Sequence, residues 1–123
     1  MTVPQIKAFV ICENIIVDQA GRFSLINIYN HLNVVSQFPA NHLLKIYLSF
    51  FAPQGAHKVI ISLAISGQEK VVEHEFLLDL DNKVDFVVEM PVIVESSGVY
   101  FITALLDGQE LSKTDLIVEE VKA

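Results

Sequence analysis

Four histidines are the residues of this sequence best suited to chemistry, because imidazole is the commonest side-chain ligand of transition metals. They stand at His31, His42, His57 and His74. None falls in an H-x-H or H-E-x-x-H pattern, and the sequence contains no C-x-x-C pair that could complete a site. A metal site would need three of these side chains to converge from distant segments. We therefore interpret them as two loop histidines, one at a strand end and one within a strand.

A cluster of side-chain oxygens offers a second kind of metal chemistry. Asp79, Asp81, Asn82 and Asp85 lie close together in the sequence, as in the carboxylate-rich loops that bind Ca²⁺ in some β-sandwiches. A leucine and a lysine interrupt the cluster, and calcium takes about six to eight oxygen ligands. We interpret this segment as a solvated acidic turn and expect no metal and no other cofactor.

Candidate nucleophiles are equally sparse. Cys12 is the only cysteine, and it falls in the apolar register Ile6, Ala8, Val10, Cys12, where a thiol is typically an inert small hydrophobic group. No serine stands in a G-x-S-x-G elbow, and the 5 glycines are too dispersed to form a phosphate-binding loop. The sequence therefore predicts no catalytic residues, and we expect a protein that is not an enzyme.

The charge distribution argues against two classes of partner. The net charge is −7, from 15 acidic and 8 basic residues, and the basic residues are scattered singly. Such a surface has no cationic stripe to bind a phosphate backbone or an anionic membrane. The apolar stretches are interrupted well before the roughly 20 residues that a membrane helix needs. A single cysteine and an N-terminus without a signal-peptide pattern predict a cytoplasmic protein.

The elements that carry these residues are short. Glycine, proline and Asp/Asn clusters divide the chain into segments rich in Val, Ile, Leu, Phe and Tyr, and helix-length segments with apolar residues at i, i+3 and i+4 are missing. The whole chain, residues 1–123, fits a single domain. We predict an all-β fold, an antiparallel two-sheet β-sandwich of about eight strands. The predicted strands span 5–12, 22–29, 43–52, 57–66, 69–78, 83–90, 99–106 and 111–119.

Apolar and polar residues alternate along these strands and identify the expected core. The inward faces of the third to sixth strands should carry Leu44, Ile46, Leu48 and Phe50, then Val59, Ile61, Leu63 and Ile65, then Val72, His74, Phe76 and Leu78, then Val84, Phe86, Val88 and Met90. Glycine-containing turns at 66–68 and 107–108 predict tight hairpins between the strands on either side.

Six further apolar side chains fall on faces that alternation assigns to solvent. They are Phe9, Ile11, Tyr47, Phe51, Phe101 and Leu105. The outer face of an antiparallel sheet is normally polar, and hydrophobic residues already make up 52% of this chain. These side chains could form a protein interface, or the segments 30–42 and 91–98 could fold over them. Both possibilities satisfy the same burial requirement.

The N-terminal third carries a recognisable block of sequence. It runs from Val3 to Phe9, through Cys12–Ile15 and Asp18–Tyr29, to Phe38-Pro39, and Ser97–Tyr100 with Asp107-Gly108 follow later. In these segments the chain resembles a family of short, uncharacterised bacterial all-β proteins, a domain of unknown function. The resemblance implies a sandwich-like fold in a bacterial cytoplasm and brings no activity or catalytic residues with it.

Two functional hypotheses follow from the sequence. The first is a non-enzymatic protein-interaction or structural module that binds itself, as a homo-oligomer and most simply a two-fold dimer, or another protein. The six outer apolar residues would supply its interface. The second is a β-sandwich that binds a small ligand or a metal at a site carried by loops. The first is favoured because apolar residues are in surplus while site motifs are missing.

Overall fold

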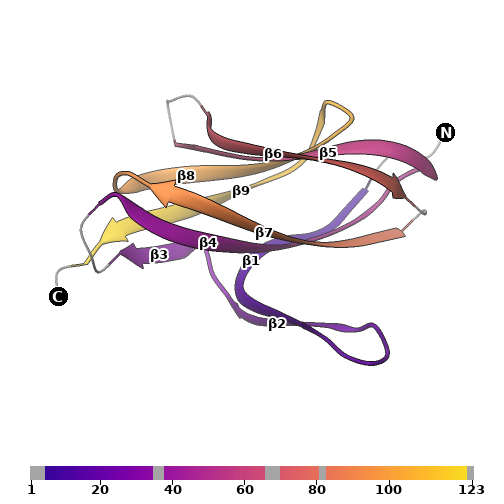
Figure 1. The fold of residues 1–123 in the computed structure, drawn as a ribbon, viewed down its shortest axis with the longest axis horizontal. Helices are drawn as coiled ribbons and strands as arrows, with labels where there is room; N and C mark the ends of the chain where they lie inside the picture. Colours follow the sequence, from indigo (N-terminus) through magenta and orange to yellow (C-terminus); the bar gives the residue numbers. More distant parts are fainter. Residues whose placement is uncertain (1–4, 35–37, 66–69, 81–82, 122–123) are drawn as a thin grey trace.

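A computed structural model of the chain describes residues 5–34, 38–65, 70–80 and 83–121, without the side chains of 70–72 and 80. All of its elements are β-strands (Figure 1), which confirms the prediction of an all-β fold. In the described residues there is no helix of the length and hydrophobicity needed to cross a membrane. The strands are β1 (Gln5–Val17), β2 (Phe23–Ile28), β3 (His31–Val34), β4 (Ala40–Phe51), β5 (Gly55–Ile65), β6 (Lys70–Leu80), β7 (Lys83–Val94), β8 (Gly98–Leu106) and β9 (Gln109–Glu120).

The strands form two sheets. Sheet A has the order β2-β1-β4-β7, and sheet B, which is curled like half a barrel, has the order β3-β9-β8-β5-β6. All neighbours are antiparallel except β3 and β9, which run parallel. The prediction of purely antiparallel pairing is therefore wrong. The prediction of two sheets is confirmed, while their arrangement as a regular sandwich stays a prediction.

The strand β3 is the element that the sequence analysis missed. It has four residues, too few to show an alternating pattern, and it lies in the segment 30–42 that was expected to be a loop. Val34 of β3 is buried in the core, and so are Val92 and Val94 near the end of β7. Val34, Val92 and Val94 therefore belong to strands that line the core.

The core lies between the two sheets. Its largest contribution comes from β4, where Leu44, Ile46, Leu48 and Phe50 are all fully buried, as predicted. Sheet B faces them with buried residues of β5 and β8: Val59, Ile61, Leu63, Tyr100, Ile102, Ala104 and Leu106. The ring of Phe76 in β6 packs edge-on against the ring of Phe86 in β7, with 5.2 Å between the centroids. The predicted inward faces are confirmed, except that the side chain of residue 72 lies outside the described ones.

The prediction for β1 is wrong about which face points inward. The pairing register shifts between residues 6 and 8, so the alternation expected from the start of the strand is displaced by one. Beyond the shift, Phe9 pairs with Leu48 and Ile11 with Ile46, both of which face the core. Ile11 is therefore a buried core residue and Phe9 packs against the core, and neither lies on an outer face.

The turn at Asp107-Gly108 confirms one predicted hairpin. Both residues have positive φ, 50° and 85°, the conformation that a two-residue turn between twisted strands requires. This turn joins β8 to β9, which pair along their length. The strands β5 and β6 also pair as predicted, but their connecting turn at 66–68 lies outside the described residues.

Asp107 is also linked, through His57, to the segment between β4 and β5 that crosses from sheet A to sheet B. One of its carboxylate oxygens accepts from the backbone N–H of Lys58 at 2.9 Å, and the other lies 2.5 Å from Nδ1 of His57. On its other side, Nε2 of His57 lies 2.6 Å from the carbonyl oxygen of Pro53 in the crossing segment. A neutral imidazole donates from one nitrogen only, so the protonated ring is the form that satisfies both acceptors.

The hydrogen bond to Asp107, and then the one to Pro53, raise the pKa of His57 above its ordinary value of 6.5. The contact therefore stabilises the fold fully below about pH 6.5 and loses this contribution as the pH rises through the higher pKa of the folded state. The hydrogen bond from His57 lowers the pKa of Asp107 below its ordinary value of 3.8. The stability that this carboxylate contributes to the fold is therefore present above about pH 3.8 and is lost in more acidic solution.

We predict that the free energy of unfolding falls by about 1 kcal/mol as the pH rises above neutrality, a modest value because Asp107 is half exposed to solvent. Urea unfolding of the wild type and of His57→Gln between pH 5 and pH 9 measures this. The substituted protein should lack this step, and the control His31→Gln should retain it. A wild-type curve identical in shape to that of His57→Gln would contradict the prediction.

Candidate interaction surface

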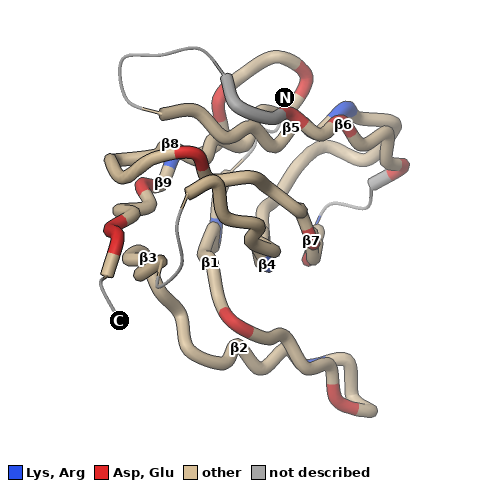
Figure 2. Tube along the Cα trace, turned by 60° about the vertical axis from the view of Figure 1, so that its left-hand side comes forward, with Lys and Arg blue, Asp and Glu red and all other residues tan. Residues whose placement is uncertain are grey.

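The hairpin of β1 and β2 extends away from the two sheets (Figures 1 and 2). The strand β1 pairs with β4 only as far as Cys12, and its remaining residues, 13–17, pair with β2 alone. A two-stranded ribbon is marginally stable by itself in water, so the shape of this hairpin must be supported by its turn and by packing at its base.

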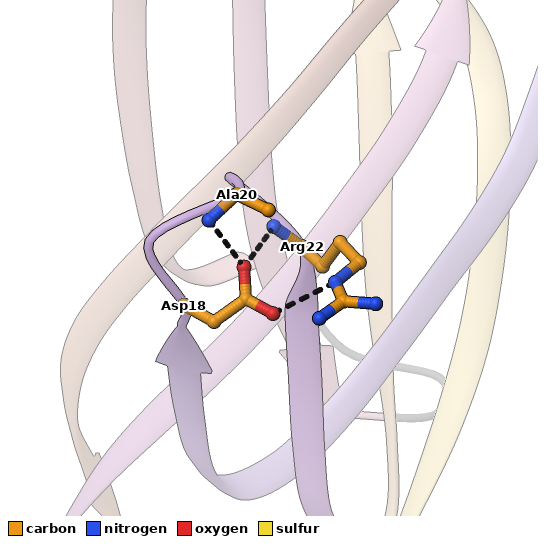
Figure 3. Close-up of polar contacts among 3 residues, drawn as sticks. All are labelled: Asp18, Ala20 and Arg22. Carbon is orange, nitrogen blue, oxygen red and sulfur yellow. Dashed lines mark hydrogen bonds and ion pairs between the residues drawn. The ribbon is translucent and has the colours of Figure 1, made fainter.

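The turn is organised by one carboxylate (Figure 3). Oδ1 of Asp18 accepts from the backbone N–H groups of Ala20 and Arg22, both at 2.9 Å, and Oδ2 accepts from the Arg22 Nε at 2.8 Å. Gly21 follows with φ 78°, a conformation in which a side chain would be strained. These bonds, led by the one from the Arg22 backbone, lower the pKa of Asp18 below 3.8. The carboxylate of Asp18 thus closes the turn between β1 and β2.

Both faces of the hairpin are apolar. Cross-strand partners share a face, which places Ile15 with Leu25 on one side and puts Ile16, Ile26 and Ile28 on the other. The exposed members are Ile16, Val17, Ile26 and Ile28, with 38% to 59% of their surface open to solvent. We call these four residues the hairpin surface. A ribbon with water on both faces would ordinarily be polar on at least one of them.

The outer face of sheet A adds three more exposed apolar side chains: Leu43 of β4 and Val87 and Ile93 of β7. We call them the outer patch of sheet A. The hairpin surface and the outer patch together hold seven of the eleven exposed large hydrophobic residues of the described chain. Apolar exposure is therefore concentrated on sheet A and its hairpin.

A ring contact joins these two regions. The Phe23 ring of β2 packs on Tyr47 in the outer face of sheet A, with 5.1 Å between the centroids. Tyr47 donates to Asp85 at 2.9 Å, and Ser49 donates to the same carboxylate oxygen at 2.8 Å. The bond from Ser49 is the main cause that lowers the pKa of Asp85, while burial raises the pKa of Tyr47. This network fixes the base of the hairpin against the sheet.

A cleft lies beside the hairpin, between β3 and β4. A hydrogen bond of 2.8 Å joins Tyr29 Oη and His42 Nε2 there. Burial raises the pKa of Tyr29 to about 12 and lowers that of His42, so both groups are uncharged at neutral pH. Glu13 and His31 line the same cavity, whose volume is about 440 Å³. Its chemistry is that of neutral hydrogen-bonding groups beside one exposed carboxylate.

The six residues predicted to form an interface do not gather in one place. Tyr47 lies in the outer face of sheet A beside the hairpin, where Phe23 packs on it. Phe51 lies at the end of β4 under the ammonium group of Lys7, and Phe101 lies on sheet B under that of Lys113. Leu105, also on sheet B, is half-buried, and the two residues of β1 face inward as described above. The interface role of the outer residues stays a prediction.

The histidines lie in separate surroundings. His31 faces Glu119 at 3.4 Å, His42 pairs with Tyr29, and His74 lies half-buried in β6. Among the residues that the structure describes, no three His, Cys, Asp or Glu side chains are grouped so as to hold a metal ion. The segment interpreted as a solvated acidic turn, Asp79 to Asp85, falls partly at 81–82, outside the described residues.

Cys12 is buried as well, although beyond the register shift it lies on the opposite face of β1 from the core residue Ile11. Its Sγ lies 3.8 Å from the carbonyl oxygen of Lys45, and burial raises the pKa of the thiol. The thiolate, which is the nucleophilic form, is therefore disfavoured at this position.

The hairpin surface is the feature that sequence reasoning passed over. Its signal was the segment Phe23–Ile28, an apolar run without a charged residue or a proline. Alternation cannot show that such a run leaves the core, because the same pattern is found in strands that are covered on both faces. Which residues stay exposed depends on where the pairing of β1 with β4 ends.

Comparison with known proteins supports the fold and does not assign an activity. The profile described as "Family of unknown function (DUF6941)" matches residues 7–119. No curated protein matches the sequence significantly. Among solved structures, the Pseudomonas fluorescens alkylpurine DNA glycosylase AlkC, bound to DNA containing an abasic site analog, is similar with a TM-score of 0.56 at 12% identity. The match covers 94% of this chain but 30% of the glycosylase chain, and it shows a shared fold alone.

We predict that Asp18→Ala loosens the hairpin and leaves the body of the protein folded. The substitution removes three acceptor contacts from a turn that lies outside the core. Hydrogen exchange should become faster in residues 14–26 and remain unchanged in β4, β5 and β8. Asp115→Ala, on the exposed side of β9, is the control. Unchanged exchange in the hairpin would show that the turn does not depend on this carboxylate.

Proposed function

The chain belongs to this family of unknown function, DUF6941, and because membership brings no activity with it, we propose from its surface that the protein is a non-enzymatic module that binds protein. One observation carries the proposal. The exposed apolar side chains of the described chain are concentrated on the hairpin surface and on the outer patch of sheet A. Exposed apolar patches of this kind are typical of protein interfaces.

The energetic reason is the hydrophobic effect. Apolar area removed from water contributes about 25 cal/mol per Å², and the hairpin cannot bury its own two faces at the same time. Within the described part of the chain, Phe23 is the one hairpin residue whose ring packs on an aromatic side chain of the sheet, so the four residues of the hairpin surface gain most from a partner. A protein surface with an apolar centre and a polar rim supplies such a partner.

Charge favours a protein over nucleic acid as that partner. The Lys and Arg positions in Figure 2 are isolated along the trace, and several Asp and Glu positions lie on the same elements. With a net charge of −7, the approach to a phosphate backbone is opposed by the field of the whole chain. The fold shared with a DNA-bound glycosylase therefore does not lead us to propose DNA binding for this chain.

We predict that Ile28→Glu abolishes partner binding while the protein stays folded. Ile28 is 59% exposed, so a charge there disturbs the surface and not the core. The measurement compares proteins retained by immobilised wild type, Ile28→Glu and the control Leu77→Glu, with further copies of the chain counted as a partner. Leu77 is 77% exposed on β6, far along the chain from the hairpin. Loss of the same partner from both variants would argue against the hairpin surface.

We also predict that the protein does not bind DNA at physiological salt. Fluorescence anisotropy with a labelled duplex, intact or containing an abasic analogue, should show no change at protein concentrations of about 10 µM, which lies within the range of dissociation constants typical of non-specific binding. Saturable binding that weakens with added salt would overturn the assignment of a protein partner.

A further inference from the structure

We propose that the cleft between the hairpin, β3 and the start of β4 binds a small organic cation, an alkyl amine or alkyl guanidine whose charged nitrogen group is bound by Glu13. The inference goes beyond the proposed function, because none of the four residues of the hairpin surface lines this cleft. The two sites can therefore be tested separately.

The cleft exists because β1 leaves β4 before β4 begins. The last pair between them joins Cys12 to Lys45, whereas β4 starts at Ala40. Residues 40–44 therefore have β7 on one side and, within the described part of the chain, no paired strand on the other. The hairpin and β3 complete a cavity of about 440 Å³ at this place. Small-molecule sites have volumes of roughly 300–1,000 Å³.

A carboxylate with a fixed orientation lines the cleft. Oε2 of Glu13 accepts a hydrogen bond of 2.9 Å from Nδ2 of Asn27 on the facing strand. Its other oxygen, Oε1, has no hydrogen-bond donor among the described residues. A carboxylate accepts several hydrogen bonds, and ammonium and guanidinium groups are donors only. Glu13 can therefore accept from such a group without losing its bond to Asn27.

The wall of the cleft suits the rest of such a ligand. Tyr29 is half-buried and is held by its hydrogen bond to His42, whose ring meets it edge-on with 6.2 Å between the centroids. A tyrosine ring attracts a cation that lies over its face. Leu32 and Leu43 line the same cavity and offer apolar contacts to an alkyl chain. The cleft thus combines one carboxylate with an aromatic and aliphatic wall.

The charges around the cleft favour a cation. No Lys or Arg is among the described residues that line it, and Glu119 brings a second carboxylate to its rim, 3.4 Å from His31. Burial, and then the charges of neighbours that include Glu13, raise the pKa of Tyr29 to about 12. A field that opposes a negative charge on Tyr29 favours a positive charge beside it. The net charge of −7 acts in the same direction.

Other classes of ligand fit this cleft less well. A phosphate or carboxylate ligand is typically bound by Arg, Lys or the N-terminus of a helix, and the described lining of the cleft provides none of these. Burial lowers the pKa of His42, so its ring supplies no positive charge at neutral pH. A metal ion would need a group of ligating side chains that the described residues do not form.

Titration followed by NMR tests the site in the full chain. Butylammonium chloride should shift the amide signals of Glu13, Tyr29, Asn33 and His42 in a saturable way. The dissociation constant should be millimolar, as expected for a ligand with few atoms. Sodium chloride at equal ionic strength and sodium butyrate should not produce these shifts. A titration without saturable shifts at the cleft would overturn the proposal.

A matched pair of variants tests the role of the carboxylate. Glu13→Gln keeps an acceptor for Asn27 and removes the charge, so the dissociation constant of butylammonium should rise about tenfold, the loss of one charge-assisted hydrogen bond. Glu110→Gln removes the same charge from an exposed position at the opposite end of β9 from Glu119 and should leave binding unchanged. Equal weakening by both variants would indicate general attraction to an acidic surface and would refute the site.

A second pair of variants keeps Glu13 in place. Asn33→Lys adds a competing ammonium group at an exposed position of the lining and should abolish butylammonium binding. Gln109→Lys adds the same charge far along β9 and should have no effect. The amide spectrum establishes that each variant is folded. Undiminished binding by folded Asn33→Lys would contradict the proposed location.

The cationic group can belong to a free amine or to a lysine side chain of a protein, and a blocked tripeptide, acetyl-Gly-Lys-Gly-amide, distinguishes these sources. Binding of the tripeptide as tightly as butylammonium supports the site and identifies a lysine side chain as a sufficient ligand. Binding of butylammonium alone supports the site and identifies a free small amine. Binding of neither overturns the proposal. Ile28→Glu should retain amine binding, so failure of the protein-binding function at the hairpin surface would be seen independently.

Discussion

The inner face of β4 runs through the centre of this protein. Its four apolar side chains are fully buried between the sheets, and its backbone is paired with β1 on one side and with β7 on the other. Sheet B curls over that face and supplies the facing side chains from β5 and β8. Because a close-packed core fixes both the register and the facing of strands, the other elements take their positions from this contact.

The part of the chain that extends beyond β4, the hairpin of β1 and β2, is stabilised by local interactions. The strand β1 continues past its last partner in β4, and the hairpin that follows depends on the Asp18 turn and on the Phe23–Tyr47 contact. The remaining apolar side chains of the hairpin stay outside the core, because β4, β7 and the strands of sheet B already fill it. The hairpin therefore exposes apolar side chains, and its edge strand β2 exposes backbone groups, that a partner could bind.

The polar residues that first suggested chemistry serve mainly to organise turns and crossings. Asp18 accepts the hydrogen bonds that organise the hairpin turn. Asp107 binds His57, which in turn contacts the segment between β4 and β5. Asp85 accepts hydrogen bonds from two hydroxyl groups on the outer face of sheet A. Each of these carboxylates has a lowered pKa for the same reason, namely donors that stabilise its charged form. Backbone N–H groups supply donors to Asp18 and Asp107, and side-chain hydroxyl groups supply those to Asp85, so we interpret these acidic residues as structural.

The sequence by itself determined the fold class, the core faces of β4, β5 and β7, and the hairpin that flanks Asp107-Gly108. These features follow from alternation and turn chemistry, which act between residues close in the chain or directly opposed across it. Only the tertiary structure decided that His31–Val34 joins β9 in parallel, that Ile11 faces the core, and that the hairpin surface stays exposed. Those outcomes depend on a register shift and on where pairing between distant strands ends, and side-chain pattern along a single strand carries no information about either.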